Sequence, residues 1–208
     1  MPKISVFFDP LCGWCYAIAP ALEALAQQSE LRLVPTGLFS QPGRRMTPEF
    51  AAHAWRNDQR IAQLTGQVFS QHYHDHILQQ DTAFDSSSLL LALTWVQQQA
   101  PAQEVLALHA LQKARYVDGL DTTQLTVQAQ VLAQLGLGIS TEAIVQALQS
   151  PELLAATQAR LIAGQHLAQE FHVQGVPQAF IQTDDDWQAI ASGELLQRTA
   201  ELNGVVAP

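Results

Sequence analysis

The sequence predicts an α/β fold that carries a large all-helical insertion. Three observations predict it. Apolar runs over residues 4–8 and 31–38 flank a stretch of strong helix formers, which is a β-α-β opening. Strand patterns then disappear over residues 43–150, where capped helical patterns follow one another. Two strand-like pieces return at 179–182 and 187–190, and a last helical pattern closes the chain.

The opening elements follow from hydrophobic spacing. A buried strand is expected over residues 3–8. A helix that starts at residues 12–15 continues through a stretch of strong helix formers from Ala17 to Gln28, where Leu22, Leu25 and Ala26 recur at helical spacing. The second strand, 31–38, contains Pro35, which lacks the N–H that an interior strand uses. Pro35 therefore indicates an edge strand, a bulge or the strand end.

The central segment reads as helices with recognisable starts and stops. Thr47-Pro48-Glu49 supplies an N-cap, a proline at the first helical position and an acidic first turn. Further helices are expected after 85–87, over 104–116, over 122–135 and from 140 to about 150. We therefore expect an inserted helical domain, 43–150, within a discontinuous domain formed by 1–42 and 151–208.

The closing elements begin with a long helix that Ser150-Pro151-Glu152 caps and that runs to about Phe171. Gly164 within it predicts a close packing contact, because glycine costs a helix about 1 kcal/mol relative to alanine. The strands 179–182 and 187–190 form a hairpin whose turn is Asp184-Asp185-Asp186. A final helix is expected from Glu194 to about Leu202.

Composition excludes several classes of partner. The 208 residues carry a formal charge of −9, and the 10 Lys and Arg residues form no long run. Duplex nucleic acid and anionic membrane are therefore not expected partners. No apolar run approaches the roughly 20 residues of a membrane span. The first residues show no signal-peptide pattern, so a cytoplasmic location is expected.

The chemistry is concentrated in Cys12-Gly13-Trp14-Cys15, which holds both cysteines of the chain. A strand that leads into Cys-x-x-Cys at a helix start is typical of a redox dithiol, because the helix N-terminus stabilises a thiolate. Cys12 is the expected exposed attacking thiol, and Cys15, inside the first helical turn, the less exposed resolving thiol. Without a histidine between the cysteines, only an intermediate lowering of the Cys12 pKa is expected.

Together with Gly175-Val176-Pro177 ahead of the last hairpin, this motif resembles the thioredoxin-like superfamily, and removing the helical segment leaves the thioredoxin topology. The chain is more similar to the DsbA family, in which a helical domain interrupts that fold. The stretches 8–16 and 114–121 resemble the branch of FrnE-type proteins and protein-disulfide isomerases. The resemblance implies a thioredoxin fold with a large inserted all-helical domain.

The resemblance also implies a function and a set of site residues. It implies a thiol–disulfide oxidoreductase of the protein disulfide isomerase type, with Cys12 and Cys15 as the redox pair. Pro177 would be cis and face them, and Val176 could pair its backbone with an extended substrate. Tuning or substrate-binding roles are expected for Pro10, Gly13, Trp14, Val176 and Pro177. The direction of the reaction stays open at this point.

The expected partners are protein or peptide thiols and disulfides, with glutathione or a thioredoxin-type protein as reductant. No cofactor beyond the dithiol is expected, although glutathione could serve as co-substrate. Arg44-Arg45 could receive an anionic group such as a glutathione carboxylate, although a solvated loop is the simpler interpretation. Glu23 could buffer protons for the resolving thiol, or it could be an ordinary helix carboxylate.

Two other classes of function remain open. One is a glutathione-dependent kappa-class transferase or a 2-hydroxychromene-2-carboxylate isomerase-like enzyme, although such enzymes usually have a serine at the Cys12 position. The other is a non-catalytic metal binder that uses the two thiols. One cysteine pair supplies only two of four zinc ligands. The histidines between His72 and His76 read as a helical segment, so no metal site is expected.

Overall fold

The computed structural model describes residues 1–183 and 186–205. Its centre is a four-stranded sheet of order β2-β1-β3-β4. β1 pairs in parallel with β2 and antiparallel with β3, and β3 pairs antiparallel with β4. The strands are β1 (Lys3–Phe8), β2 (Glu30–Pro35), β3 (Gln178–Thr183) and β4 (Asp186–Ile190).

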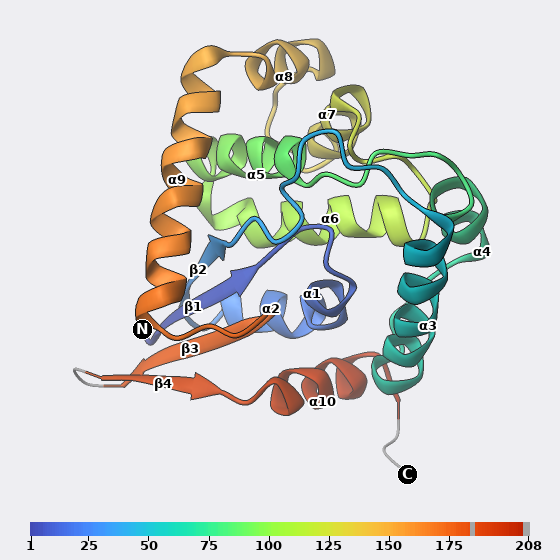
Figure 1. The fold of residues 1–208 in the computed structure, drawn as a ribbon. Coiled ribbons are helices and arrows are strands. Elements are labelled where there is room, and N and C mark those ends of the chain that lie inside the picture. The colour runs from blue at the N-terminus through green and yellow to red at the C-terminus, as the bar shows by residue number, and fades with distance from the viewer. Residues whose placement is uncertain (184–185, 206–208) are drawn as a thin grey trace.

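The alternation of side chains along β1 decides which helices cover each face of the sheet. Val6 and Phe8 belong to the main core with the helices that follow β1, whereas Phe7 points to the opposite face. On that opposite face Phe7 packs against Phe180 and Phe171. Figure 1 shows the long helix α9 (Pro151–Glu170) running along one side of the molecule, beside β1 and β2.

The predicted α/β fold with inserted helices is confirmed. Between β2 and α9 the described chain is helical, and these helices gather beyond one end of the sheet (Figure 1). Helix α10 lies against α2 and α3. The helices outside α9 are α1 (Gly13–Ala17), α2 (Ala19–Ala26), α3 (Pro48–Thr65), α4 (Gln71–Tyr73), η1 (His74–Leu78), α5 (Ser87–Gln99), η2 (Pro101–Gln103), α6 (Glu104–Tyr116), α7 (Leu125–Ala133), α8 (Thr141–Leu148) and α10 (Ser192–Leu202).

The predicted helix start at the cysteine motif is confirmed, because α1 begins at Gly13 with Cys12 as its N-cap. The expected single helix through Gln28 is instead broken at Ile18 into α1 and α2. Pro20 lies in the first turn of α2 and has no N–H to donate to the Tyr16 carbonyl. Gln67 Nε2 donates to that carbonyl instead, at 2.7 Å. A residue of the insertion therefore stabilises the break just behind the cysteines.

The strand that was expected over 31–38 is shorter and ends at Pro35, on the sheet edge, as its missing N–H requires. Gly164 of α9 lies against this end. A Cβ at Gly164 would come 2.2 Å from the Pro35 carbonyl oxygen, so only glycine lets α9 approach the strand so closely. The predicted close contact at Gly164 is confirmed.

Other boundaries move by a few residues. The helix expected from 122 begins at Leu125, because Asp121 accepts from both the N–H and the hydroxyl of Thr123 in a preceding turn. The hairpin strands are confirmed. Of the turn expected at Asp184–Asp186, Asp186 begins β4 and residues 184–185 lie outside the described residues. Within the described ranges, no helix combines the length and apolarity that a bilayer crossing requires.

Candidate active site

The two cysteines lie at the junction of β1 and α1. Cys12 is the N-cap residue of α1, and Cys15 lies in its first turn. Both are free thiols, 3.6 Å apart. Cys12 is 7% exposed and Cys15 2%. The expectation of an exposed Cys12 is thus wrong in degree, because the insertion and the Val176 loop cover it, although Cys12 remains the more accessible thiol.

Hydrogen bonds separate the two thiols chemically. The Cys15 thiol donates to Cys12 and lowers the Cys12 pKa, as do the backbone N–H groups of Cys15 and Trp14, while burial and Asp9 act against them. Burial raises the pKa of Cys15 well above its ordinary value, and the hydrogen bond to Cys12 adds to the effect. Cys12 is therefore the thiol that ionises first, which suits a nucleophile or leaving group.

The Val176–Pro177 loop lies on the other side of Cys12. The Val176–Pro177 peptide bond is cis. The Cys12 thiol donates to the Val176 carbonyl over 3.6 Å, so the loop contacts the sulfur directly. Trp14, Ile18, Val176 and Pro177 line a hollow of about 280 Å³, here called the proline hollow, together with Ser192 and Leu196.

A second hollow opens toward the insertion and is called here the insert cavity. It has a volume of about 240 Å³. The lining residues come from α1, α3, α4, α6 and the three loops that precede α1, α3 and α5: Leu11, Cys12, Gly13, Trp14, Phe39, Phe50, His53, Ala54, Asn57, Asp58, Ile61, Tyr73, Phe84 and Tyr116. Cys12 thus borders a cavity whose far wall is built by the insertion.

Aromatic side chains of the insertion hold the cysteine loop in place. Tyr116 of α6 donates its hydroxyl to the Leu11 carbonyl at 2.9 Å, immediately before Cys12. Its ring stacks on Tyr16 with 5.0 Å between centroids. Tyr73 meets Tyr116 edge to face at 5.1 Å. These contacts connect the loop before Cys12 and the helix that follows it to α4 and α6.

Asp9, which ends the approach from β1, is a buried structural carboxylate. Its Oδ1 accepts from Leu11 N, and its Oδ2 accepts from Phe39 N and the Ser86 hydroxyl. Burial raises the Asp9 pKa, and the three donors act against that rise. Asp9 thereby fixes the turn before Cys12 to the loop after β2 and to the start of α5.

The remaining predicted site residues fall in different places. Gly13 is required by space, because a Cβ there would lie 2.8 Å from Asp58 Oδ1. Trp14 borders both hollows, and the Arg60 guanidinium lies 5.9 Å from its ring centroid. Pro10 is buried in the turn and is not among the described residues lining either hollow.

The charged side chains for which glutathione binding or proton transfer is predicted, Arg44, Arg45 and Glu23, all contact other side chains of the protein. Arg44 lies over the rings of Phe39, Phe50 and Phe84, three walls of the insert cavity. Arg45 pairs with Asp81 at the surface. Glu23 pairs with His109 of α6.

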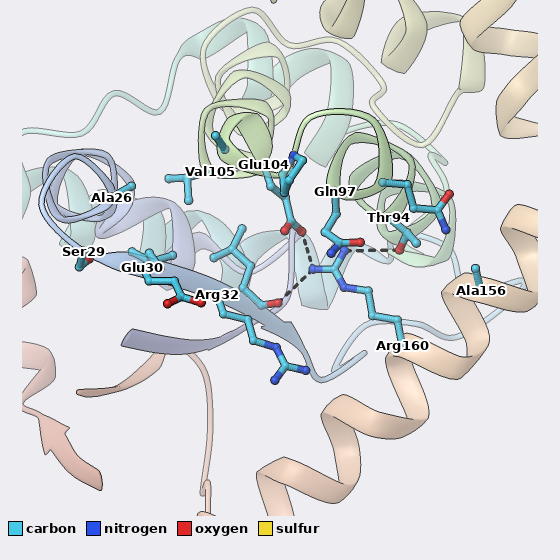
Figure 2. Close-up of a pocket in the computed structure, with 15 residues that line it drawn as sticks. Ala26, Ser29, Glu30, Arg32, Thr94, Gln97, Glu104, Val105, Ala156 and Arg160 are labelled. Atoms are coloured by element: carbon cyan, nitrogen blue, oxygen red, sulfur yellow. Dashed lines mark hydrogen bonds and ion pairs between the residues drawn. The ribbon is translucent and has the colours of Figure 1, made fainter. Parts of the chain in front are cut away.

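A third hollow, whose lining contains no thiol, lies between β2, α5, α6 and α9. Its volume is about 560 Å³, and Figure 2 shows Arg160 reaching across it toward Glu104 and Thr94. Arg160 pairs with Glu104 and donates to the Leu33 carbonyl at 3.0 Å. We call it the Arg160 hollow.

Sequence reasoning did not find Asp58. It lies on α3, is 4% exposed, and burial raises its pKa to about 7. The available signal was its helical spacing, since Asp58 falls on the same buried face as Ala51, Ile61 and Thr65. In the described part of the chain, no cluster of three His, Cys, Asp or Glu side chains is placed to hold a metal ion.

The fold and the site together define the class of protein. The DSBA-like thioredoxin domain matches residues 3–200, so the chain belongs to the DsbA-like family. No curated protein matches by sequence.

Among solved structures the chain is similar to the cytosolic disulfide reductase DsbM from Pseudomonas aeruginosa. The two are 26% identical, with 97% of this chain and 95% of the other covered and a TM-score of 0.83. DsbM with GSH gives 26% identity, coverage of 97% and 96%, and a TM-score of 0.76. A 2-hydroxychromene-2-carboxylate isomerase, 19% identical with coverage of 97% and 94% and a TM-score of 0.58, shares the fold.

Proposed function

We propose that this chain is a disulfide reductase that acts on protein or peptide disulfides through Cys12 and Cys15. Cys12 attacks the substrate disulfide, and Cys15 resolves the mixed disulfide by attacking the Cys12 sulfur. The observation that carries the proposal is the pair of free thiols with opposite pKa shifts, of which the more acidic one, Cys12, borders the insert cavity and contacts the Val176 carbonyl.

We further propose that a small thiol of the glutathione type returns the resulting disulfide to the dithiol. The similarity to a cytosolic disulfide reductase, whose structure is also known with GSH, supports both the reducing direction and this reductant. A reducing compartment such as the cytoplasm is the setting in which such a cycle runs toward reduction. An extended peptide substrate would bind in the proline hollow and pair with the backbone of Val176.

Two cysteine variants test the cycle. Cys12→Ser should abolish insulin reduction coupled to glutathione. Cys15→Ser should form the first bond but lack the resolving thiol, and should therefore accumulate a mixed disulfide between Cys12 and the peptide substrate that mass spectrometry detects. Wild-type turnover in Cys12→Ser would contradict the proposal. Full turnover in Cys15→Ser on small electrophiles would instead indicate transferase chemistry.

The direction is tested by equilibrating the pair against a glutathione buffer and reading tryptophan fluorescence. We expect a potential between about −200 and −270 mV, the range of glutaredoxins and thioredoxin. A value near −120 mV, as in strong oxidants, would contradict the reductase assignment. Isomerase activity is measured separately, as refolding of a scrambled disulfide protein in the same buffer.

A further inference from the structure

Asp58 is the carboxyl group of the insert cavity. It stands on α3 and lines the cavity together with Cys12 and Gly13. Its Oδ1 lies so close to Gly13 that a Cβ there would come within 2.8 Å. The carboxyl group therefore borders any small molecule that enters between α3 and the first turn of α1.

The two carboxyl oxygens of Asp58 have different surroundings. Oδ2 accepts the Tyr73 hydroxyl at 3.2 Å. Oδ1 has no hydrogen-bond partner among residues 1–183 and 186–205, although it faces the cavity wall at Gly13. One oxygen is thus fixed by the insertion, and the other is free to exchange a proton with a ligand.

The positive charge nearest to Asp58 does not lock it into an ion pair. Arg115 of α6 is 1% exposed, and its two terminal nitrogens have no partner in the described chain. It lowers the Asp58 pKa through space without an ion-pair contact. A buried carboxyl in direct contact with arginine would stay ionised, whereas this one can change its protonation state.

We propose that Asp58 is the general base that deprotonates a small thiol in the insert cavity, so that the thiolate can attack the Cys12–Cys15 disulfide. The inference rests on the proposed function, since it concerns the step that returns the disulfide to the dithiol. It assigns the insert cavity to the low-molecular-weight reductant and leaves the proline hollow to the peptide substrate.

The step balances as follows. The Asp58 carboxylate takes the proton of the thiol RSH, and RS⁻ attacks Cys12 Sγ. A Cys12–SR bond forms, the Cys12–Cys15 bond breaks, and the electron pair goes to Cys15, which takes up a proton because its pKa is high. A second thiol, as RS⁻, then attacks the sulfur of the bound SR group. The Cys12–SR bond breaks, RSSR leaves, and Cys12 departs as the thiolate or, after taking up a proton, the thiol. The enzyme disulfide is reduced by two electrons, and two thiols are oxidised to one disulfide.

The acidity of Asp58 suits this role. Its pKa of about 7 makes it a base near neutral pH, which is where a proton acceptor combines availability with strength. The charged and titratable groups around it are Tyr73 on α4, Arg115 and Tyr116 on α6, His53 on its own helix and Cys12 on α1. Burial raises the pKa of both tyrosines, so they remain neutral near pH 7.

The test is the rate at which glutathione reduces the oxidised protein, followed by stopped-flow tryptophan fluorescence from about pH 5.5 to about pH 9.5, roughly one unit beyond the ordinary pKa values of His and Cys. Wild type should show a rise with an inflection near pH 7. Asp58→Asn, which keeps an acceptor for Tyr73, should be slower by about a hundredfold at neutral pH and lose that inflection. In wild type the hydrogen bond from the Tyr73 hydroxyl lowers the Asp58 pKa. Tyr73→Phe removes that hydrogen bond and should therefore raise the Asp58 pKa and move the inflection to higher pH.

Two measurements separate proton transfer from other effects. An aryl thiol that is already ionised throughout the pH range needs no base, so Asp58→Asn should be reduced by it at the wild-type rate or faster. The equilibrium with glutathione should not change, since a base alters forward and reverse rates equally. Asp75→Asn, an exposed carboxylate on η1, is the matched control and should keep the wild-type rate and inflection with glutathione.

Wild-type rate and inflection in Asp58→Asn would overturn the inference, and so would an equal loss of rate with the aryl thiol. The rate loss in Asp58→Asn could also be matched by an equal change in the equilibrium constant with glutathione. That result would overturn the inference too, because Asp58 would then act on the disulfide through its charge alone. If the wild-type disulfide is not reduced by any thiol, the proposed function itself fails, which is a distinguishable result.

Discussion

Two buried carboxyl groups in this protein have opposite surroundings. Glu104, in the Arg160 hollow, contacts the guanidinium of Arg160, which also donates to the Leu33 carbonyl (Figure 2). Asp58, in the insert cavity, accepts one hydroxyl and has no ion-pair contact in the described chain. The Arg160 hollow is the larger of the two, yet only the insert cavity holds a thiol.

The comparison teaches that pairing, and not burial or cavity size, separates a structural carboxylate from a chemical one. Burial raises the pKa of both groups. At Glu104 the charges of Arg160 and Arg32 act against the rise and the ion pair connects α9 with α6 and β2. At Asp58 the pKa reaches about 7, where a proton can be exchanged.

The largest expected effect is the change that Asp58→Asn makes in the free energy of unfolding. The folded-state pKa, about 7, lies above the ordinary 3.8, so the native state binds more protons between these values. Stability that is present below about pH 4 is therefore lost as pH rises toward 7. At about 1.4 kcal/mol for each pKa unit, the variant should be up to about 4 kcal/mol more stable than wild type at pH 8 and similar at pH 4.

Urea unfolding of both proteins across that pH range measures the difference, and Asp75→Asn serves as the control, since Asp75 is exposed and its His74 contact lowers its pKa. A difference between Asp58→Asn and wild type that does not change with pH would contradict a carboxyl with a raised pKa.

The next effect is the loss of the ion pair. Arg160→Met leaves Glu104 buried without its partner and should destabilise the fold by about 3 kcal/mol, more at high pH where Glu104 must ionise. The double variant Arg160→Met with Glu104→Leu should recover most of that loss, because it removes the unpaired charge. Thermal unfolding gives the stabilities, and glutathione reduction kinetics should remain those of wild type. Slowed kinetics in the double variant would show that the two regions are not independent.

The smallest expected effect concerns a third buried carboxylate. Ser86→Ala removes one of three donors to Asp9 and should cost about 1–2 kcal/mol. The Asp9 pKa should rise, since the Ser86 hydroxyl lowers it. Denaturant unfolding gives the cost, and the pH dependence of iodoacetamide alkylation reports the Cys12 thiolate, whose pKa Asp9 raises. An unchanged stability would mean that the two backbone donors suffice.

The sequence by itself determined the order of elements and the position of the two cysteines at the start of a helix. Local signals carry both: the alternation in β1, the capped helix starts at Thr47 and Ser150, and the adjacency of Cys12 and Cys15. Each depends on residues within a few positions of one another, where propensity and spacing act directly. Gly164 was predictable for the same reason, because a glycine inside a helix needs a local justification.

Only the tertiary structure decided what surrounds the thiols. Asp58 is 46 positions away from Cys12 along the chain, and Tyr116 is 104 positions away, so no local pattern brings either to the cavity. Which helices pack together decides three further features. These are the burial of Cys12, the hydrogen bond from Gln67 to the Tyr16 carbonyl at the helix break, and the contrast between Asp58 and Glu104. Desolvation and charge act through space, so a carboxyl group's pKa is a property of the packed molecule and not of its neighbours in sequence.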